Sequence, residues 1–201
     1  MRLGQVLYFS LIVSMGSKTF AAHTIAGTIE SFTYMPAYGL ATAVSVLVGM
    51  SVGEHKPCQA LSYTVKASAC GVFLMSLLGL VLWILAPDLT QLFTTDTSAS
   101  AQTITALHIA AINQPVLALS LILPAALQGA GDTKTPLVTT LLGMWGIRVL
   151  GIWILGQVSG WGIRGIWIAI GIDLTLRSLF LANRFFQKVH TLERNPKHEI
   201  L

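Results

Sequence analysis

The amino-acid sequence predicts an all-α fold, a polytopic membrane protein in which six transmembrane helices form one bundle. Hydrophobic residues make up 54% of the chain and charged residues only 10%, whereas a soluble domain carries about 25% charged residues. The mean hydropathy of +0.72 agrees with this balance. The chain also contains apolar stretches close to the roughly 20 residues that a helix needs to cross a bilayer. We therefore expect the lipid bilayer to be one partner of this protein.

Six apolar blocks account for the six predicted helices. The first is short and begins almost at the first residue, so we expect a helix with a truncated start; a secretory signal is the alternative for it. The other five approach the length of a spanning helix. Because no linker or shift in composition separates them, residues 1–201 are interpreted as a single transmembrane helical bundle. The blocks run from Leu3 to Ser14, Thr24 to Gly49, Ala60 to Leu85, Ile104 to Gln128, Leu137 to Leu155, and Ile166 to Phe186.

The second and fourth blocks contain interior prolines, which are the hinge candidates of the chain. Pro36 lacks an amide hydrogen and its ring clashes with the preceding turn, so we expect it to open the second helix. Gly39 nearby would leave room for a neighbouring backbone. Pro115 and Pro124 free carbonyl groups in the fourth helix, which need a packed helix, a side chain or water as partner. Each proline can act as a hinge or as a static kink.

Positive charge alternates between the connections that join the blocks. The first, third and fifth connections carry only Lys18 and Arg164. By the positive-inside rule, we expect the more basic connections and both termini to lie in the cytoplasm. We expect the protein to reside in the plasma membrane, which is the inner membrane of a bacterium. The longest connection, residues 86–103, is expected to be an exposed extracytoplasmic loop that begins with a short interfacial helix. The basic set comprises Lys56, Lys134, Arg184, Lys188, Arg194 and Lys197.

The fourth connection, in the sequence GAGDTKTP, predicts a sharp reversal between two helices. Gly129 and Gly131 would supply left-handed backbone angles at the end of a helix, and Asp132 would bond to the following turn. Pro136 can occupy the first turn of the next helix. The spacing of a nucleotide-binding P-loop is absent from this segment.

The sequence gives no support to several functional classes. The net charge of +4 comes from scattered loop residues, not from the dense basic face that binds nucleic acid. The HExxH and GxSxG motifs of enzymes are absent, so we expect no enzymatic activity. Cys58 and Cys70 lack the spacing of a metal or redox motif, and we expect reduced thiols, no metal and no organic cofactor.

Glu30 is one of four ionisable residues inside the predicted helices, where a charge costs about 2.5 to 3.5 kcal/mol. It shares a helical stripe with His23 and Tyr34. A buried carboxylic acid there could take up and release a proton and so couple transport to an ion gradient. The alternative is a carboxyl group held by Tyr34, or by a neighbouring helix, as a packing device. Lys66 lies near the end of its helix and can extend to the membrane surface.

Asp173 and Arg148 are the remaining charged residues within the helices. Asp173 can pair with Arg177, four residues later on the same helix. Arg148 has no acidic residue within four positions, so its partner must come from elsewhere, either Asp173 or Glu30, or it contributes to a cavity that tolerates anions.

Aromatic residues offer two interpretations. A pocket lined by Tyr34, Trp145, Trp153 and Phe73, together with methionines, could hold flat organic cations. Trp and Tyr near helix ends more often anchor a protein at the membrane surface. We assign that anchoring role to Trp83, Trp161 and Trp167.

Two segments resemble the multidrug and toxic compound extrusion family. Residues 20–57 read FAAHTIAGTIESFTYMPAYGLATAVSVLVGMSVGEHKP, and residues 113–136 read NQPVLALSLILPAALQGAGDTKTP. In that family an AAH start, a proline near mid-helix and a VG turn recur in one helix of the C-terminal half, and LQGAGDTKTP closes a later helix. The likeness covers most of the chain.

The resemblance implies a twelve-helix antiporter made of two six-helix lobes, with this chain as the C-terminal lobe and the N-terminal lobe as its missing partner. It implies export of amphipathic, often cationic drugs or metabolites in exchange for H⁺ or Na⁺. A related flippase for lipid-linked saccharides is the alternative, for which a more cationic cavity is expected.

The family resemblance also implies a cation site built from acidic residues on the first and fourth helices of the lobe. Here the first block is short, and the fourth offers His108, Asn113 and Gln114 but no carboxylate. We therefore expect proton coupling, or coupling through the absent lobe. The candidates for ion coupling or substrate binding are Glu30, Tyr34, Asn113, Gln114, Arg148 and Asp173.

Overall fold

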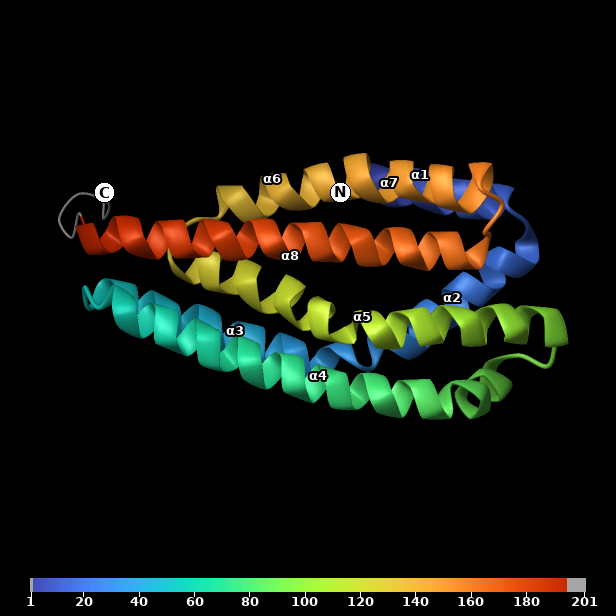
Figure 1. Cartoon of the computed structure of the whole chain (residues 1–201), viewed down its shortest axis with the longest axis horizontal. Helices are drawn as coiled ribbons and strands as arrows, with labels where there is room; N and C mark the ends of the chain where they lie inside the picture. Colours follow the sequence, from blue (N-terminus) through green and yellow to red (C-terminus); the bar gives the residue numbers. More distant parts are fainter. Residues whose placement is uncertain (1, 195–201) are drawn as a thin grey trace.

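The computed structural model describes residues 2–194, and every regular element in that range is a helix. The predicted basic residue Lys197 and the side chain of Arg194 lie outside the described part. The long helices lie side by side along one axis (Figure 1). In chain order they are α1 (Arg2–Ser14), α2 (Ser17–Ser31), α3 (Tyr34–Gly53), α4 (Pro57–Phe93), α5 (Thr97–Gly129), α6 (Lys134–Leu142), η1 (Gly143–Arg148), α7 (Val149–Gly151), η2 (Ile152–Val158) and α8 (Ile163–Arg194).

Within residues 2–194, five helical stretches are long and apolar enough to cross a membrane. They are α3, α4, α5, the continuous stretch from Lys134 to Val158, and α8. These correspond to the five longer blocks of the sequence, which confirms the helical membrane fold. Helix α1 has 13 residues, so the prediction of a short first helix is also confirmed.

The second predicted helix is divided into α2 and α3 at Phe32 and Thr33. Pro36 explains the position of the break, because it cannot donate to the carbonyl of Phe32, four residues earlier, and its ring clashes with that carbonyl. The hydroxyl of Thr33 donates to the carbonyl of Glu30 at 2.7 Å and closes the end of α2. The predicted opening of this helix is confirmed, while its movement as a hinge stays a prediction.

Helix α5 runs through the centre of the bundle, where it packs against α2, α3, α4 and α8. It stays helical through Pro115 and Pro124 and bends near its middle (Figure 1). Interior prolines are a common cause of such bends. More than half of its membrane-length window is buried, at 56%, which identifies α5 as the helix around which the others are arranged.

The expected loop over residues 86–103 is wrong. Helix α4 continues through Pro87 to Phe93, and only residues 94–96 separate it from α5. Ala86 and Thr90 are both fully buried, so packing on one face holds the last turns of α4 in helical form despite the proline. The side chain of Asp96 then accepts a hydrogen bond from the backbone amide of Ser98 at 2.9 Å and caps the start of α5.

The connections alternate between the two ends of the bundle (Figure 1). The α3–α4 and α5–α6 turns lie at the same end as the last turns of α8, and the α1–α2, α4–α5 and η2–α8 turns lie at the other. This confirms the predicted grouping of the basic connections. An ion pair between Arg184 and Asp132, 3.5 Å apart, ties α8 to the α5–α6 turn at the first end.

The α5–α6 turn matches its prediction at three of four positions, one of which is Pro136 in the first turn of α6. Gly131 has a φ angle of +82°, as expected, and Asp132 accepts hydrogen bonds from the amide and the hydroxyl of Thr135 at 3.0 and 2.6 Å. Gly129 instead ends α5 in helical form, and a Cβ atom there would lie 2.3 Å from the carbonyl oxygen of Ser45. The close approach of backbones expected at Gly39 is therefore wrong, because no other helix in the described part of the chain comes within 4 Å of a Cβ atom added there. It occurs at Gly129.

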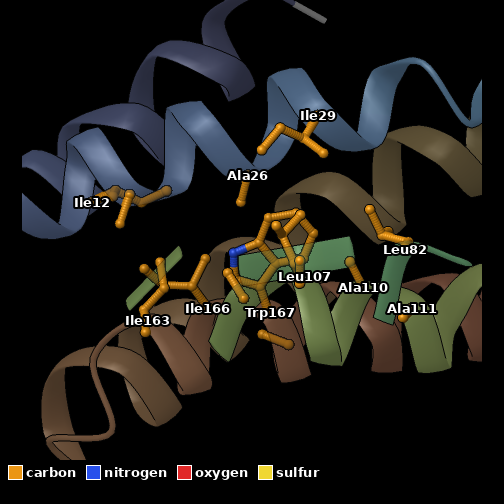
Figure 2. Packing of buried hydrophobic residues seen from close by; sticks show 14 of the residues in the cluster. Ile12, Ala26, Ile29, Leu82, Leu107, Ala110, Ala111, Ile163, Ile166 and Trp167 are labelled. Carbon is orange, nitrogen blue, oxygen red and sulfur yellow. The ribbon is translucent and has the colours of Figure 1, made fainter. Parts of the chain in front are cut away.

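Trp167 lies inside the bundle and does not anchor it at the membrane surface. It is 2% exposed, and its ring packs among Ile12, Ala26 and Leu107 from α1, α2 and α5 (Figure 2). The prediction of an interfacial anchor is wrong at this residue. Trp83 and Trp161 are 42% and 54% exposed, so they remain on the surface where such anchors act.

Candidate functional site

A cavity of about 810 Å³ is lined by residues of α1, α2, α3, α5, α6, η1 and α8. Its volume lies in the range of about 300 to 1,000 Å³ that is typical of small-molecule sites. Helices of opposite direction contribute to its wall, so it forms only when the bundle is assembled. Its charged residues are Glu30, Arg148 and Arg177, and its polar residues include Tyr8, His23 and Tyr34.

Glu30 is held in the wall of the cavity beside the α2–α3 break. It is 7% exposed, and the hydroxyl of Tyr34 donates to its Oε2 atom at 2.9 Å. Because Tyr34 is the first residue of α3, this bond crosses the break. His23, two helical turns earlier, is also buried at 7% exposure and lines the same cavity. The predicted stripe of three polar residues is confirmed, and Tyr34 holds the carboxyl group as the packing alternative proposed.

A second charged group is built on α8 and the neighbouring π-helical segment η1. Asp173 is 1% exposed, and its Oδ2 atom accepts from Nη2 and Nε of Arg148 at 2.8 and 3.1 Å. Arg177 approaches the same oxygen at 3.8 Å. The partner of Arg148 is therefore Asp173, and the predicted pair of Asp173 and Arg177 is also formed.

The lack of a side chain at Gly143 makes room for this cluster. A Cβ atom there would lie 2.4 Å from Oδ1 of Asp173. Gly143 begins η1, and Arg148 ends it, so the wider turns of this segment place both residues beside α8. π-Helical turns are rare and often occur at functional sites.

The cavity thus has an acidic wall and a basic wall. Glu30 comes from α2, while Arg148 comes from η1 and Arg177 from α8. Two guanidinium groups share one carboxylate, so the Asp173 cluster carries a positive charge when all three groups are ionised. A molecule that enters the cavity meets both signs of charge.

The two predicted amides on α5 serve as contacts between helices. Gln114 is fully buried, and its Nε2 atom donates to the hydroxyl of Thr33 at 3.0 Å, which ties the α2–α3 break to α5. Asn113 lies against Gly171 of α8, where a Cβ atom would be 2.6 Å from its amide. Neither residue is among the described residues that line the cavity, whereas Pro124 is.

The expected aromatic pocket is wrong in its composition. Trp145, Trp153 and Phe73 are 42%, 50% and 73% exposed and do not line the cavity among its described residues. Its aromatic wall consists of Tyr8, Tyr34, Tyr38 and Trp167.

Trp167 was expected at the membrane surface, but its spacing from other residues of α8 indicates a place in the cavity wall. Trp167, Ile170, Leu174 and Arg177 follow one another at intervals of three or four residues along one face of α8, and all line the cavity. Because the charge of Arg177 would be costly in lipid, this face of α8 is expected to face the protein interior. Trp167 lies on the same face, ten residues before Arg177. For Tyr8, by contrast, the sequence contains no such signal, because its helix is short and has no charged residue that marks the same face.

Comparison with known proteins identifies relatives over nearly the whole chain. The model of the family described as MatE matches residues 2–154. A probable multidrug resistance protein NorM of Thermotoga maritima is 24% identical over 201 residues, covering 98% of this chain and 43% of that protein. The multidrug resistance protein NorM of Burkholderia vietnamiensis is 34% identical over 190 residues, covering 91% of this chain and 41% of that protein.

A solved structure shares the fold. A crystal structure described as MATE in the straight conformation superposes with a TM-score of 0.90 at 20% sequence identity, covering 97% of this chain and 44% of the other. At that identity the likeness concerns the fold. The chain spans about two fifths of the length of these proteins, at 41% to 44%.

Proposed function

The chain belongs to the MatE family, the multidrug and toxic compound extrusion transporters, and on that premise we propose that it forms the C-terminal lobe of a secondary active antiporter. The transporter would export amphipathic, often cationic drugs or metabolites in exchange for H⁺ or Na⁺. An N-terminal lobe of six further helices would close the other side of the substrate path. Alternating access would then arise from movement of one lobe against the other.

The observation that carries this proposal is the position of Glu30. Its carboxyl group is 7% exposed and stands in the wall of a cavity of about 810 Å³ between helices that cross the membrane. Ionisable residues at such positions face ion or substrate pathways, because they need a proton, a cation or a charged partner to be tolerated. The hydrogen bond from Tyr34 holds the group in place without neutralising it.

Two features favour H⁺ over Na⁺ as the coupling ion in this lobe. A sodium site would need several oxygen ligands around Glu30, and among the described residues that line the cavity with Glu30 neither Asn113 nor Gln114 is present. Among the described residues, the side chain of Glu30 has a single hydrogen-bond partner, Tyr34. A single carboxyl group of this kind can carry one proton.

The family and the apolar helices make this an integral membrane protein. We further propose the bacterial inner membrane, with the α3–α4 and α5–α6 turns and the end of α8 in the cytoplasm. The basic residues of those segments carry this orientation. The transport cycle would involve no covalent step, so we assign the protein no enzymatic role.

The flippase alternative is less well supported. The relatives that match over most of the chain are described as multidrug resistance proteins. The arginines of the cavity, Arg148 and Arg177, are paired with Asp173, and Glu30 lines the same cavity, so it is not the strongly cationic cavity expected for a lipid-linked saccharide flippase.

The proposal is tested with Glu30→Gln in vesicles that contain the complete product of the gene. Ethidium efflux is measured under an imposed proton gradient and, separately, under a sodium gradient. We expect the variant to lose most of the gradient-driven efflux of the wild type, because the amide cannot exchange a proton. Glu54→Gln is the matched control, since Glu54 is an exposed acid in the α3–α4 turn. Normal transport by Glu30→Gln under both gradients would show that Glu30 has no part in coupling.

A further inference from the structure

Three polar aromatic side chains meet at one corner of the cavity, and the proposed coupling does not use them. Tyr8 comes from α1, His23 from α2 and Trp167 from α8. The ring centroids of His23 and Trp167 are 5.6 Å apart, and those of Tyr8 and His23 are 5.4 Å apart. All three line the cavity. We call this group the aromatic corner.

Two polar atoms of the aromatic corner lack a hydrogen-bond partner among the described residues. The hydroxyl of Tyr8 is hydrogen-bonded to Nε2 of His23, but Nδ1 of His23 and Nε1 of Trp167 are buried and unpaired. The two side chains are 93% and 98% buried, being 7% and 2% exposed. Buried polar groups in proteins are almost always paired, so two such atoms in one corner indicate a missing partner.

The orientation of the indole agrees with a shared partner. Figure 2 shows the nitrogen of Trp167 on the side of its ring that faces Ile12 and Ala26, the side on which α1 and α2 lie. His23 stands one turn before Ala26 on α2. The unpaired indole nitrogen therefore faces the helix pair that supplies the other two members of the corner.

We propose that the aromatic corner is a subsite for a hydroxyl group of the exported molecule; this inference rests on the transport function proposed above. The indole N–H can only donate, while Nδ1 of His23 donates or accepts according to the tautomer fixed by Tyr8. A hydroxyl oxygen accepts from Trp167, and the same group can donate to or accept from His23. A carbonyl group can only accept, so it fits one tautomer and not the other.

The surroundings of the corner define the rest of the ligand. The rings of Tyr8 and Trp167 offer apolar faces to the carbon skeleton beside the hydroxyl. Glu30 lies two turns further along α2 and faces the same cavity, where it can attract a cationic part of the molecule. The preferred substrate is thus an amphipathic cation with a hydroxyl group at the end of an aromatic arm.

The test compares two matched cations, (4-methylphenyl)triphenylphosphonium and (4-hydroxymethylphenyl)triphenylphosphonium, which differ by one hydroxyl group. Their affinities for the complete product of the gene are measured by calorimetry. We expect the wild type to bind the hydroxyl compound more tightly by about threefold to tenfold, the range of one buried neutral hydrogen bond. Trp167→Phe keeps an aromatic ring but removes the N–H group, so the preference should fall close to one. Affinity for the methyl compound should persist, which also shows that the variant is folded.

A second variant and a control complete the experiment. His23→Leu should reduce the same preference, while Trp161→Phe, at an exposed indole in the η2–α8 turn, should leave it unchanged. The subsite would be overturned if the wild type and Trp167→Phe showed the same preference, including the case in which the variant loses affinity equally for both compounds, because Trp167 would then not recognise the hydroxyl group. If the wild type neither binds nor exports either cation, the transport proposal itself fails.

Discussion

Asp173 permits two arginine side chains to lie inside the helix bundle. Its carboxylate is 1% exposed and receives a forked interaction from Arg148 and a longer one from Arg177. Taking charges out of water is costly, and the mutual attraction of the pair offsets this cost only while both signs are present. The cluster joins η1 to α8 and forms the basic wall of the cavity. A change at Asp173 should therefore affect the stability of the bundle before it affects any step of transport.

We predict that Asp173→Asn is strongly destabilising, because it leaves two guanidinium groups buried without a counter-charge. Removing one partner of a buried pair costs about 3 to 5 kcal/mol. The side chains of Arg148 and Arg177 are 20% and 15% exposed, so water can solvate part of their charge. We therefore expect a loss of stability at the lower limit, about 3 kcal/mol. For a chain of this size that corresponds to a fall in Tm of about 6 to 12 °C, measured by thermal unfolding in detergent.

The control for this prediction is Glu54→Gln. Glu54 also pairs with a basic residue, Lys56, but both side chains are more than half exposed, and such surface pairs contribute little. Its Tm should equal that of the wild type. If Asp173→Asn melted at the same temperature, the cluster would not be the stabilising contact that the geometry indicates.

The contact between α3 and α5 depends on a glycine at the end of α5. An added Cβ atom at Gly129 would lie 2.3 Å from the carbonyl oxygen of Ser45, and a backbone atom in a helix cannot move aside as a flexible side chain can. In membranes, small residues allow helices to approach closely, and dispersion contacts then hold them together. The two helices meet here next to the α5–α6 turn, which is therefore fixed to α3 as well as to α8.

At this contact, Gly129→Ala should separate α3 from α5 and lower stability by about 1 to 3 kcal/mol, the usual range for overpacking. Gly39→Ala is the matched control in α3, because no atom lies within 4 Å of its Cβ position. There the loss of backbone freedom in the unfolded chain should stabilise the protein by about 0.4 to 1 kcal/mol. The pair is compared by thermal unfolding. Two variants that shift Tm in the same direction would contradict the close approach.

The whole bundle places alternate connections at opposite ends. The α4–α5 turn contains Thr95, and the α5–α6 turn contains Thr133; both are exposed and lie at the two ends of α5. A membrane around the apolar middle of the helices would separate these two residues. The basic residues near Thr133 predict that its end is cytoplasmic.

This orientation predicts the outcome of cysteine labelling in intact cells. Both native cysteines, Cys58 and Cys70, are free and exposed, so they are first replaced by serine. Thr95→Cys should then react with a membrane-impermeant maleimide added outside, whereas Thr133→Cys should react only after the cells are permeabilised. The reverse pattern would invert the orientation, and labelling of both residues from one side would contradict the arrangement of helices itself.

Much of the helical framework follows from local sequence. Pro36 predicts the opening before α3, because its missing amide leaves the carbonyl four residues earlier without its helical hydrogen bond. Gly131 and Asp132 predict the α5–α6 turn for the same kind of reason. The end of α4 could not be predicted from local sequence. Burial of Ala86 and Thr90 keeps the helix intact beyond Pro87, and that burial depends on neighbouring helices.

The sequence by itself determined the membrane class, the five long spans, the alternation of connections and the residues whose charge needs a partner. Only the tertiary structure decided that Trp167 faces the cavity and Trp145 does not, and that Arg148 pairs with Asp173 and not with Glu30. The physical reason is that lipid and protein interior are similarly apolar. Hydropathy therefore predicts that a residue is removed from water, but it does not predict what surrounds the residue. The rotation of each helix relative to its neighbours decides whether the residue contacts lipid, another helix or the substrate cavity.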